Sequence, residues 1–310
     1  MPIPEISPSP AVIRGLVKRR GAVIAVNGLD LTLRVGEVTA QLGPNGAGKS
    51  TAVALLTGRL APDKGHVSVF GGDPRKAASR ARLGVMLQEA GMPRGLTVAE
   101  QIDLFRGYFT SSRPRAELID LAGLNGLERR RCSALSGGQQ RRLQFALAIC
   151  GRPDLLILDE PTTGLDIEAR HPLWSAVRVE AARGAAVLLT THYLEEAEAL
   201  ADRVMVIDRG RVIADGPPAS LKAAAASSAI RCVTRSSDAV LGALTGVFQV
   251  SREGARVVLM TRDAKTTVRE LLVHDPDLED LTLAGASLED AFTRLLADSA
   301  GTQHTLENAA

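Results

Sequence analysis

Short, continuous apolar runs alternate with longer segments of mixed apolar and polar positions along the first two thirds of the chain. Val38–Leu42, residues 155–158 and residues 186–190 are such runs, and their length is typical of strands buried on both faces. Residues 50–60 follow a glycine-rich turn and are predicted to form a helix. Because strands and helices alternate, the pattern predicts an α/β fold with a mostly parallel core sheet.

The pattern changes after a turn at Asp208-Arg209-Gly210. The strand-like runs on either side of this turn, residues 204–207 and 211–214, predict an antiparallel hairpin near the edge of the sheet. Residues 216–218, Gly-Pro-Pro, then break the pattern, and a second, small α+β unit is predicted beyond them. Its expected strands are residues 230–234, 248–252 and 256–261, and its expected helices are residues 268–274 and 288–296.

The 310 residues are therefore divided into four segments. They are a flexible N-terminus (1–15), a main α/β domain (16–219), a small α+β domain (220–297) and a disordered tail (298–310). No stretch approaches the roughly 20 apolar residues that a membrane span requires. The N-terminus also lacks the basic and apolar segments of a signal peptide. We therefore expect a cytoplasmic location, with any membrane role carried by a partner chain.

Charge and composition argue against nucleic-acid binding. Lys and Arg total 37 against 35 Asp and Glu, so the net charge of +2 gives no broad attraction to phosphate backbones. Aromatic residues make up 3% of the chain, too few for a platform that stacks single-stranded bases. The three cysteines, Cys132, Cys150 and Cys232, form no C-x-x-C pair and are expected to be reduced thiols.

A glycine-rich segment between a predicted strand and a predicted helix matches the phosphate-loop pattern G-x-x-x-x-G-K-[ST]. Its glycines let the backbone curl round phosphate oxygens and turn N–H groups towards them. Lys49 supplies a positive charge for the β- and γ-phosphates, and the Ser50 hydroxyl can bind Mg²⁺. The sequence therefore predicts that ATP and Mg²⁺ bind at Gly43, Pro44, Asn45, Gly46, Ala47, Gly48, Lys49, Ser50 and Thr51.

Two acids, Asp159 and Glu160, end the apolar run at residues 155–158. Functional groups of a parallel sheet lie at the carboxyl ends of its strands, so both acids are expected beside the phosphates. Asp159 is suited to hold Mg²⁺ or its water shell, and Glu160 to polarise an attacking water. Acids that simply end a strand are the structural alternative, which the phosphate loop disfavours.

The segment Leu-Ser-Gly-Gly-Gln at residues 135–139 follows a loop and leads into an apolar helix. Two glycines at a helix start allow the backbone to approach an anion closely, and Ser136 can donate a hydrogen bond. From these residues alone, phosphate binding and an ordinary helix cap are equal alternatives.

The same segment resembles the signature motif of the ABC ATPases. Gln88 in Val-Met-Leu-Gln-Glu resembles the Q-loop of that family, Asp166 in Gly-Leu-Asp its D-loop, and His192 in Thr-Thr-His-Tyr its switch histidine, all in the family's order. The resemblance covers about residues 16–219. It implies a P-loop NTPase domain of the ABC type, with a mostly parallel core sheet, an antiparallel β part and a helical subdomain that carries the signature.

The resemblance also implies that two copies of the chain share each ATP. Domains of this family pair head to tail, and each ATP lies between the phosphate loop of one and the signature of the other. A homodimer is therefore expected here. The residues that would contact ATP bound to the opposite copy are Ser136, Gly137, Gly138 and Gln139.

Further roles follow from the resemblance. Gln88 would sense the γ-phosphate and Mg²⁺ and link the site to a membrane partner, Asp166 would cross the dimer contact, and His192 would stabilise the charge that develops in hydrolysis. The expected catalytic residues are Glu160, His192 and Lys49, and the expected Mg²⁺ ligands are Ser50, Gln88 and Asp159.

One position departs from the family pattern. Family members place an aromatic residue before the first strand to stack on adenine, whereas the corresponding segment here, residues 17–21, has Arg20. A guanidinium group can also stack on a base. Arg20 is therefore either an adenine contact or a solvated charge, and base discrimination is expected to be looser.

Three kinds of ABC protein fit these motifs: a transporter subunit, a soluble ATPase that acts on ribosomes or DNA, and a binding module without hydrolysis. A single motif set without long coiled coils favours the transporter, and Glu160 and His192 argue against the pure binding module. Residues 96–100 and 287–295 resemble segments of daunorubicin-resistance-type ABC exporter ATPases. That resemblance implies export of a drug, antibiotic or lipid-like compound through a separate membrane permease, with this chain at the cytoplasmic face of the membrane.

Overall fold

The computed structural model describes residues 9–88, 91–93, 95–224, 228–285 and 287–307. The chain divides into two compact units, residues 1–216 and 217–310. The expected boundary after residue 219 is three residues too late, because Pro218 already begins a helix of the second unit. This helix, α8 (Pro218–Ala224), packs against α11 (Leu288–Glu307).

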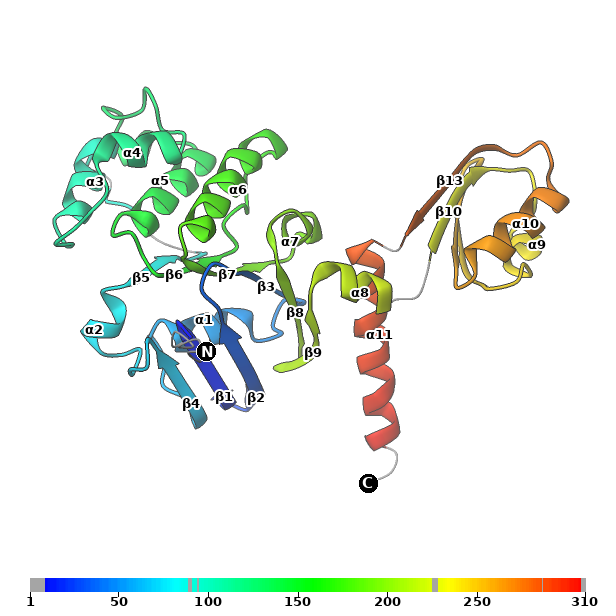
Figure 1. Cartoon of the computed structure of the whole chain (residues 1–310), viewed down its shortest axis with the longest axis horizontal. Helices are drawn as coiled ribbons and strands as arrows, with labels where there is room; N and C mark the ends of the chain where they lie inside the picture. Colours follow the sequence, from blue (N-terminus) through cyan, green and yellow to red (C-terminus); the bar gives the residue numbers. More distant parts are fainter. Residues whose placement is uncertain (1–8, 89–90, 94, 225–227, 286, 308–310) are drawn as a thin grey trace, which may run out of the picture. The chain divides into compact units, whose positions relative to one another are not determined.

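A six-stranded sheet of order β5-β6-β7-β3-β8-β9 forms the centre of the first unit (Figure 1). Only β9 runs antiparallel to its neighbour, which confirms the mostly parallel core sheet. β6, β7 and β3 are buried along their whole length, and this burial on both faces explains their almost continuous apolar sequence. The strands are β3 (Val38–Leu42), β5 (Leu83–Met86), β6 (Leu155–Asp159), β7 (Ala186–Thr191), β8 (Arg203–Asp208) and β9 (Arg211–Gly216).

A second, antiparallel sheet of order β2-β1-β4 shares one hydrophobic core with α1 and the core sheet. Its strands are β1 (Ala11–Arg20), β2 (Val23–Leu33) and β4 (Lys64–Val69). The prediction of a flexible segment is wrong for residues 11–15, because Ala11 and Ile13 point into this core and anchor the strand. Residues 1–8 of that segment lie outside the described residues.

The helix after the phosphate loop, α1 (Lys49–Leu56), ends four residues before the expected residue 60. The Thr57 hydroxyl donates back to the Val53 carbonyl at 2.8 Å, and Gly58 takes a φ of 71°. Because a left-handed glycine turns the chain out of the helix, the apolar residues beyond it do not continue α1.

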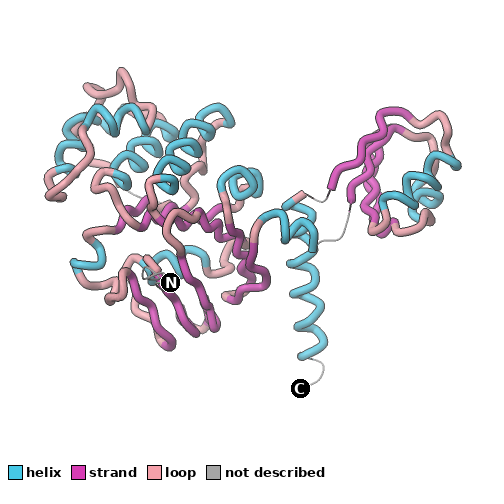
Figure 2. Tube along the Cα trace, in the orientation of Figure 1, coloured by secondary structure: helices cyan, strands magenta, loops and turns pink. Residues whose placement is uncertain are grey.

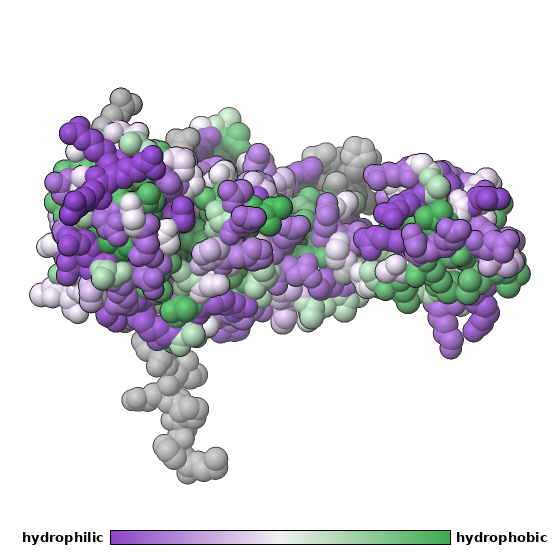
Figure 3. All heavy atoms as spheres, turned by 90° about the horizontal axis from the view of Figure 1, so that it is seen from above, coloured by the Kyte–Doolittle hydropathy of each residue, from purple (hydrophilic) through white to green (hydrophobic). Residues whose placement is uncertain are grey.

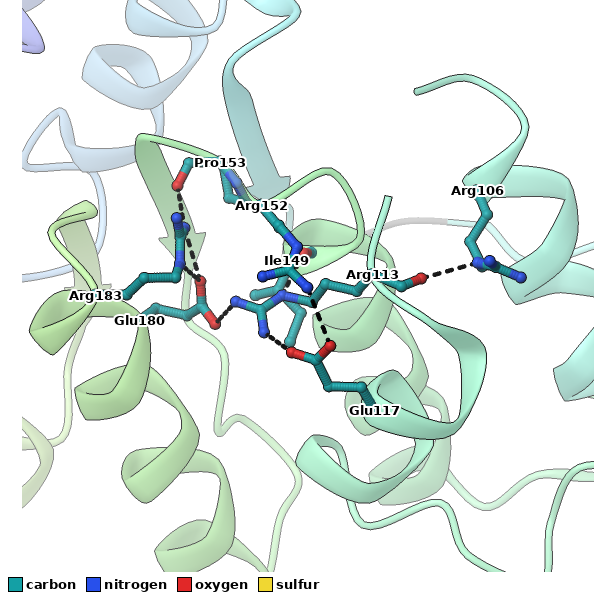
Figure 4. A network of polar contacts seen from close by, with 8 residues as sticks. All are labelled: Arg106, Arg113, Glu117, Ile149, Arg152, Pro153, Glu180 and Arg183. Atoms are coloured by element: carbon teal, nitrogen blue, oxygen red, sulfur yellow. Dashed lines mark hydrogen bonds and ion pairs between the residues drawn. The ribbon is translucent and has the colours of Figure 1, made fainter. Parts of the chain in front are cut away.

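A group of helices carries residues 98–149. Its members α3 (Val98–Arg106), α4 (Arg115–Leu121) and α5 (Gly137–Ile149) pack together. Arg113, beside α4, is buried and pairs with Glu117 and with Glu180 of α6 (Ile167–Ala182), the latter at 2.5 Å (Figure 4). This pair ties the helical part to the core. The remaining helices of the unit are α2 (Ala77–Arg80), α7 (Leu194–Leu200) and the 3₁₀ turn Cys132–Ala134.

The second unit contains a four-stranded antiparallel sheet of order β11-β12-β10-β13, with helices on one face (Figure 2). Leu241 of α9 (Asp238–Gly242) and Leu271 of α10 (Ala264–His274) pack on that face, which confirms the α+β prediction. The strands are β10 (Ser228–Val233), β11 (Val247–Glu253), β12 (Arg256–Thr261) and β13 (Glu279–Gly285).

The tail expected to be disordered from residue 298 is helical as far as Glu307, because α11 continues through it. No proline interrupts residues 298–307, and a single glycine costs a helix only about 1 kcal/mol. Helical hydrogen bonding therefore extends beyond the apolar periodicity from which residues 288–296 were predicted.

On the face drawn in Figure 3, hydrophilic residues predominate, although apolar residues gather along one side of the second unit. No described helix combines the length and hydropathy that a membrane crossing demands. The exposed large apolar side chains of the second unit are Val240, Phe248, Leu272, Val273, Leu281 and Leu283.

Candidate functional site

The phosphate loop lies between β3 and α1 at the carboxyl edge of the core sheet, where the sequence places it. Gly43 and Gly48 both lie against backbone: an added Cβ would come within 2.3 Å of the Ile207 carbonyl oxygen at Gly43 and within 2.4 Å of the Ala25 oxygen at Gly48. Gly48 also has a φ of 112°, which side-chain-bearing residues rarely adopt. The loop can therefore take this path only with glycine at these two positions.

Lys49 opens α1 with its side chain folded towards the loop. Its Nζ donates to the carbonyl oxygens of Gly43 at 2.6 Å and Pro44 at 3.1 Å. Burial lowers the pKa of Lys49, while the nearby Glu160 and Asp159 act in the opposite direction. A buried ammonium group held only by neutral carbonyl oxygens is well placed to pair with a phosphate anion.

Asp159 and Glu160 end β6 next to the strand β7. The Thr190 hydroxyl donates to Asp159 Oδ1 at 2.5 Å, and the Glu160 N–H donates to the Thr190 carbonyl at 3.0 Å. Glu160 has a φ of 51°, the left-handed region that costs a residue with a side chain free energy. The hydrogen bonds to Thr190 hold this conformation and turn the Glu160 side chain away from the strand direction.

Three segments meet at the Glu160 carboxylate. Gln88 Nε2 donates to Oε2 at 2.9 Å, Thr163 Oγ1 donates to the same oxygen at 3.2 Å, and His192 Nδ1 lies 3.4 Å from Oε1. The His192 side chain keeps 42% of its surface exposed, whereas Glu160 keeps 9%. The structure therefore brings the predicted Q-loop glutamine, Gln88, and the predicted switch histidine, His192, to the carboxylate of Glu160.

A cavity of about 540 Å³ connects this cluster to the phosphate loop. Arg20 and Val23 line one part of it, and Gln88 and Glu160 line another. Arg20 thus lies in the pocket where a base could extend from phosphates held by the loop. The other lining residues are Ala25, Asn45, Gly46, Ala47, Gly48, Lys49, Ser50 and Thr51.

The donor set of the cavity fits Mg²⁺. Ser50 offers a hydroxyl and Gln88 an amide oxygen, and both line the cavity. Asp159 does not line it but lies directly before Glu160 and is 5% exposed. Hydroxyl, amide and carboxylate oxygens with retained waters are the ligands that Mg²⁺ takes beside phosphates. Among the described residues, no group of three or more His, Cys, Asp or Glu side chains is placed to hold a metal ion.

The signature segment forms the start of α5. Ser136 Oγ accepts from the Gln139 N–H at 3.3 Å, and Gln139 Oε1 accepts from the Ser136 N–H at 3.0 Å. This reciprocal pair is a capping box, so within one copy Ser136 and Gln139 act as an ordinary helix cap. Ser136 and Gly137 are exposed, and none of residues 136–139 lines the cavity of the phosphate loop.

Sequence reasoning missed two residues of the site. Thr190 holds both Asp159 and Glu160 through hydrogen bonds. In the sequence it is a threonine within an apolar run, and nothing there marks it as a site residue. Arg141 of α5 is 9% exposed and donates to the Leu87 carbonyl at 2.9 Å. The negative charges of Glu160 and Asp159 also act on its guanidinium group. Burial lowers the pKa of Arg141. No linear pattern marks Arg141, because the groups that it contacts belong to other elements.

Comparisons with known proteins agree with this arrangement. A family profile described as "ABC transporter" matches residues 26–163. A daunorubicin/doxorubicin resistance ATP-binding protein of Streptomyces peucetius is 40% identical over 317 residues, covering 95% of this chain and 94% of the relative. The Nod factor export ATP-binding protein I of Burkholderia orbicola is 43% identical over 224 residues, covering 70% of this chain and 73% of the relative.

Solved structures share the fold of the first unit. An ATP-binding subunit of an ABC transporter matches with a TM-score of 0.63 and 26% identity, covering 69% of this chain and 92% of that one. A dimeric bacterial ABC transporter cassette matches with a TM-score of 0.61, covering 67% of this chain and 98% of that one; at 21% identity it shows the fold alone. With a relative at 40% identity along nearly its whole length, this chain belongs to the ABC transporter family as an ATP-binding subunit that hydrolyses ATP.

Proposed function

We propose that this subunit drives export of a drug, antibiotic or lipid-like compound through a separate membrane permease. The observation that carries the proposal is the convergence of Gln88 and His192 on Glu160, beside the cavity of the phosphate loop. In this reading the Q-loop joins the hydrolysis site to the permease. The subunit would therefore lie at the cytoplasmic face of the membrane.

Different residues of one copy have different roles in ATP hydrolysis. Lys49 exchanges its two carbonyl partners for the β- and γ-phosphates of ATP. Glu160 orients and polarises the water that attacks the γ-phosphate, and His192 stabilises the charge that develops on it. Mg²⁺, held by Ser50, Asp159 and Gln88, would neutralise phosphate charge when bound.

A second copy supplies the signature segment. Ser136 and Gly137 are exposed at the N-terminus of a 13-residue helix, outside the cavity of their own phosphate loop. Backbone N–H groups at such a terminus favour an anion. A head-to-tail homodimer would bring these groups to the ATP of the opposite copy, and a solved cassette of the same fold is itself described as dimeric.

Export is supported by the relatives. Two daunorubicin resistance ATP-binding proteins of Streptomyces match over more than 90% of this chain, including the second unit. A Nod factor export protein matches 70% of this chain at similar identity. These names describe export of a Nod factor and resistance to daunorubicin, so a drug, antibiotic or lipid-like compound is the proposed cargo.

Reconstitution tests this function. The tagged chain, isolated from detergent-solubilised membranes of its source, should bring down an integral membrane protein in stoichiometric amount. Inverted vesicles that contain both chains should accumulate daunorubicin when ATP is added outside, and vesicles with Glu160→Gln should not. Isolation without any membrane protein, or ATP-dependent loss of the compound from the vesicle lumen, would refute the proposed export.

A further inference from the structure

A carboxyl group buried behind the hydrolysis site has no part in the chemistry described so far. Glu196 of α7 is fully buried, and its Oε1 accepts a hydrogen bond from Trp174 Nε1 at 3.0 Å. The hydroxyl groups of Thr191 and Thr162 also lie beside this carboxyl group. Burial raises the pKa of Glu196, and these neighbours together with Arg170 partly offset that rise.

The neighbours of Glu196 belong to three segments that carry site residues. Thr162 comes two residues after Glu160, and Thr191 directly precedes His192. Trp174 lies on α6, whose N-cap is Asp166: the Asp166 carboxylate accepts from the Ala169 N–H at 2.7 Å. One side chain on α7 thus contacts the segments that carry the acid, the histidine and the D-loop aspartate.

A second set of contacts joins two of these segments. The Arg170 guanidinium group lies 4.3 Å from the centre of the Tyr193 ring, and its Nε donates to the Leu165 carbonyl at 3.4 Å. The Tyr193 ring in turn lies 4.1 Å from the His192 ring. Arg170 therefore connects the D-loop segment to Tyr193, whose ring lies beside that of His192.

Stability alone does not explain a carboxyl group at this position. Glu196 Oε2 and Thr162 Oγ1 are buried, and within the described part of the chain neither has a hydrogen-bond partner of ordinary geometry. Buried polar atoms without partners destabilise a fold, and an apolar side chain of similar volume would avoid this cost. The Thr162 hydroxyl nevertheless lies close enough to Glu196 to lower the pKa of its carboxyl group.

We propose that Glu196 is a positioning residue that couples the Asp166, Glu160 and His192 segments, so that docking of a second copy against Asp166 moves His192 into its working position. Trp174 and Arg170 transmit the movement from α6 to α7. The proposal rests on the roles proposed above for Glu160 and His192 and on the proposed head-to-tail dimer, but not on the permease or the transported compound.

Steady-state ATPase measurements on the full chain test this coupling. Glu196→Ala and Trp174→Phe should lower kcat about 10-fold and change the KM for ATP by less than about twofold, because the alignment of His192 is lost while ATP binding is kept. Glu196→Gln should restore at least half of the wild-type kcat, since its amide oxygen still accepts from Trp174. Glu195→Ala is the matched control, because Glu195 is exposed on the same helix.

Fluorescence gives a readout that a purely structural role would not move. Trp174 is the only tryptophan of the chain, so its emission reports on the Glu196 contact directly. ATP with Mg²⁺ should shift this emission in the wild type and in Glu196→Gln. The shift should be absent in Glu196→Ala, although displacement of a fluorescent ATP analogue shows that this variant still binds ATP.

Two results would overturn the coupling: a kcat for Glu196→Ala equal to that of Glu195→Ala, or a loss of kcat no larger than the loss of folded protein in thermal melts. Failure of the underlying site looks different. If Glu160→Gln hydrolysed ATP at the wild-type rate, the roles proposed for Glu160 and His192 would be refuted. The coupling through Glu196, which depends on those roles, would then be refuted too.

Discussion

At the scale of single residues, function depends on a backbone conformation that sequence patterns do not encode. Glu160 occupies the left-handed region with a φ of 51°, and the hydrogen bonds of its N–H to Thr190 hold it there. Strain of this kind persists only where the surroundings fix the residue. Here it places the carboxylate between Gln88 and His192 rather than in line with Asp159.

The first prediction concerns the carboxylate of Glu160. Glu160→Gln keeps the size and the hydrogen bonds of the side chain but removes the charge that polarises water. Its kcat should fall by about 10²-fold or more, the usual contribution of a general base. ATP affinity, measured by equilibrium dialysis, should stay within about twofold because Lys49 and the loop are unchanged. Glu168→Gln, on the exposed side of α6, is the control, and equal phosphate release by the two variants would contradict the assignment.

The second prediction concerns the base. Arg20 lines the cavity at the end of β1, where an aromatic ring would stack on adenine. Arg20→Tyr should tighten ATP binding several-fold, on the order of 1 kcal/mol, because an aromatic ring stacks on a base without the desolvation of a charge. Arg19→Tyr, whose side chain lies on the other face of the strand, should leave the affinity unchanged. An unchanged affinity for Arg20→Tyr in isothermal titration would remove Arg20 from the adenine site.

At the scale of elements, the boundary between the helical part and the core is fixed by buried charge. Arg113 pairs with Glu180, which is 0% exposed, and Glu180 also pairs with Arg183 at 3.1 Å (Figure 4). Arg183 in turn donates to the Pro153 carbonyl at 2.6 Å, just before β6. The network therefore connects the helical part that contains the signature segment with β6, the strand that Glu160 directly follows.

The third prediction tests this network. Arg113→Met leaves the Glu180 carboxylate buried with only Arg183 as partner, and should lower the free energy of unfolding by about 3 kcal/mol. Chemical denaturation followed by circular dichroism measures the change. Arg115→Met is the matched control: its ion pair with Asp103 is half exposed, so its loss should cost less than about 1 kcal/mol. Equal losses for the two variants would show that the buried pair contributes no more to the free energy of unfolding than the half-exposed pair does.

Apolar runs predicted the elements buried on both faces well. Residues 155–158 and 186–190 became β6 and β7 with one residue added to each, since nothing polar interrupts such strands. β1 was missed because it is buried on one face only, and Lys18, Arg19 and Arg20 at its end hide the alternation. Propensity also could not foresee that Gly58 would end α1 or that α11 would extend to Glu307.

The candidate site was predictable in its parts but not in its arrangement. The phosphate loop follows from spacing alone, because each residue of that motif has a local structural reason. The meeting of Gln88, Glu160 and His192 is a tertiary feature, and only the family resemblance pointed to it. Thr190 and Arg141 act through neighbours from other elements, so a linear pattern gave them no distinguishing mark.

At the scale of the whole molecule, we expect two copies of the chain to work together. Residues 136–139 of the signature segment do not line the cavity of the phosphate loop in the same copy. A complete set of motifs in each copy makes a symmetric pair with two equivalent ATP sites the natural assembly. We therefore infer that each ATP site needs a phosphate loop from one copy and a signature from the other.

Complementation between two inactive variants tests this claim most directly. Lys49→Ala damages the phosphate loop but leaves the signature intact, and Ser136→Arg does the reverse. Each variant alone should lack ATPase activity. An equimolar mixture should recover up to about a quarter of the wild-type rate, because half of the random pairs contain one intact composite site. If Ser136→Arg alone stays active, or the mixture shows only the average of the two separate rates, ATP hydrolysis takes place within a single copy and the shared site does not exist.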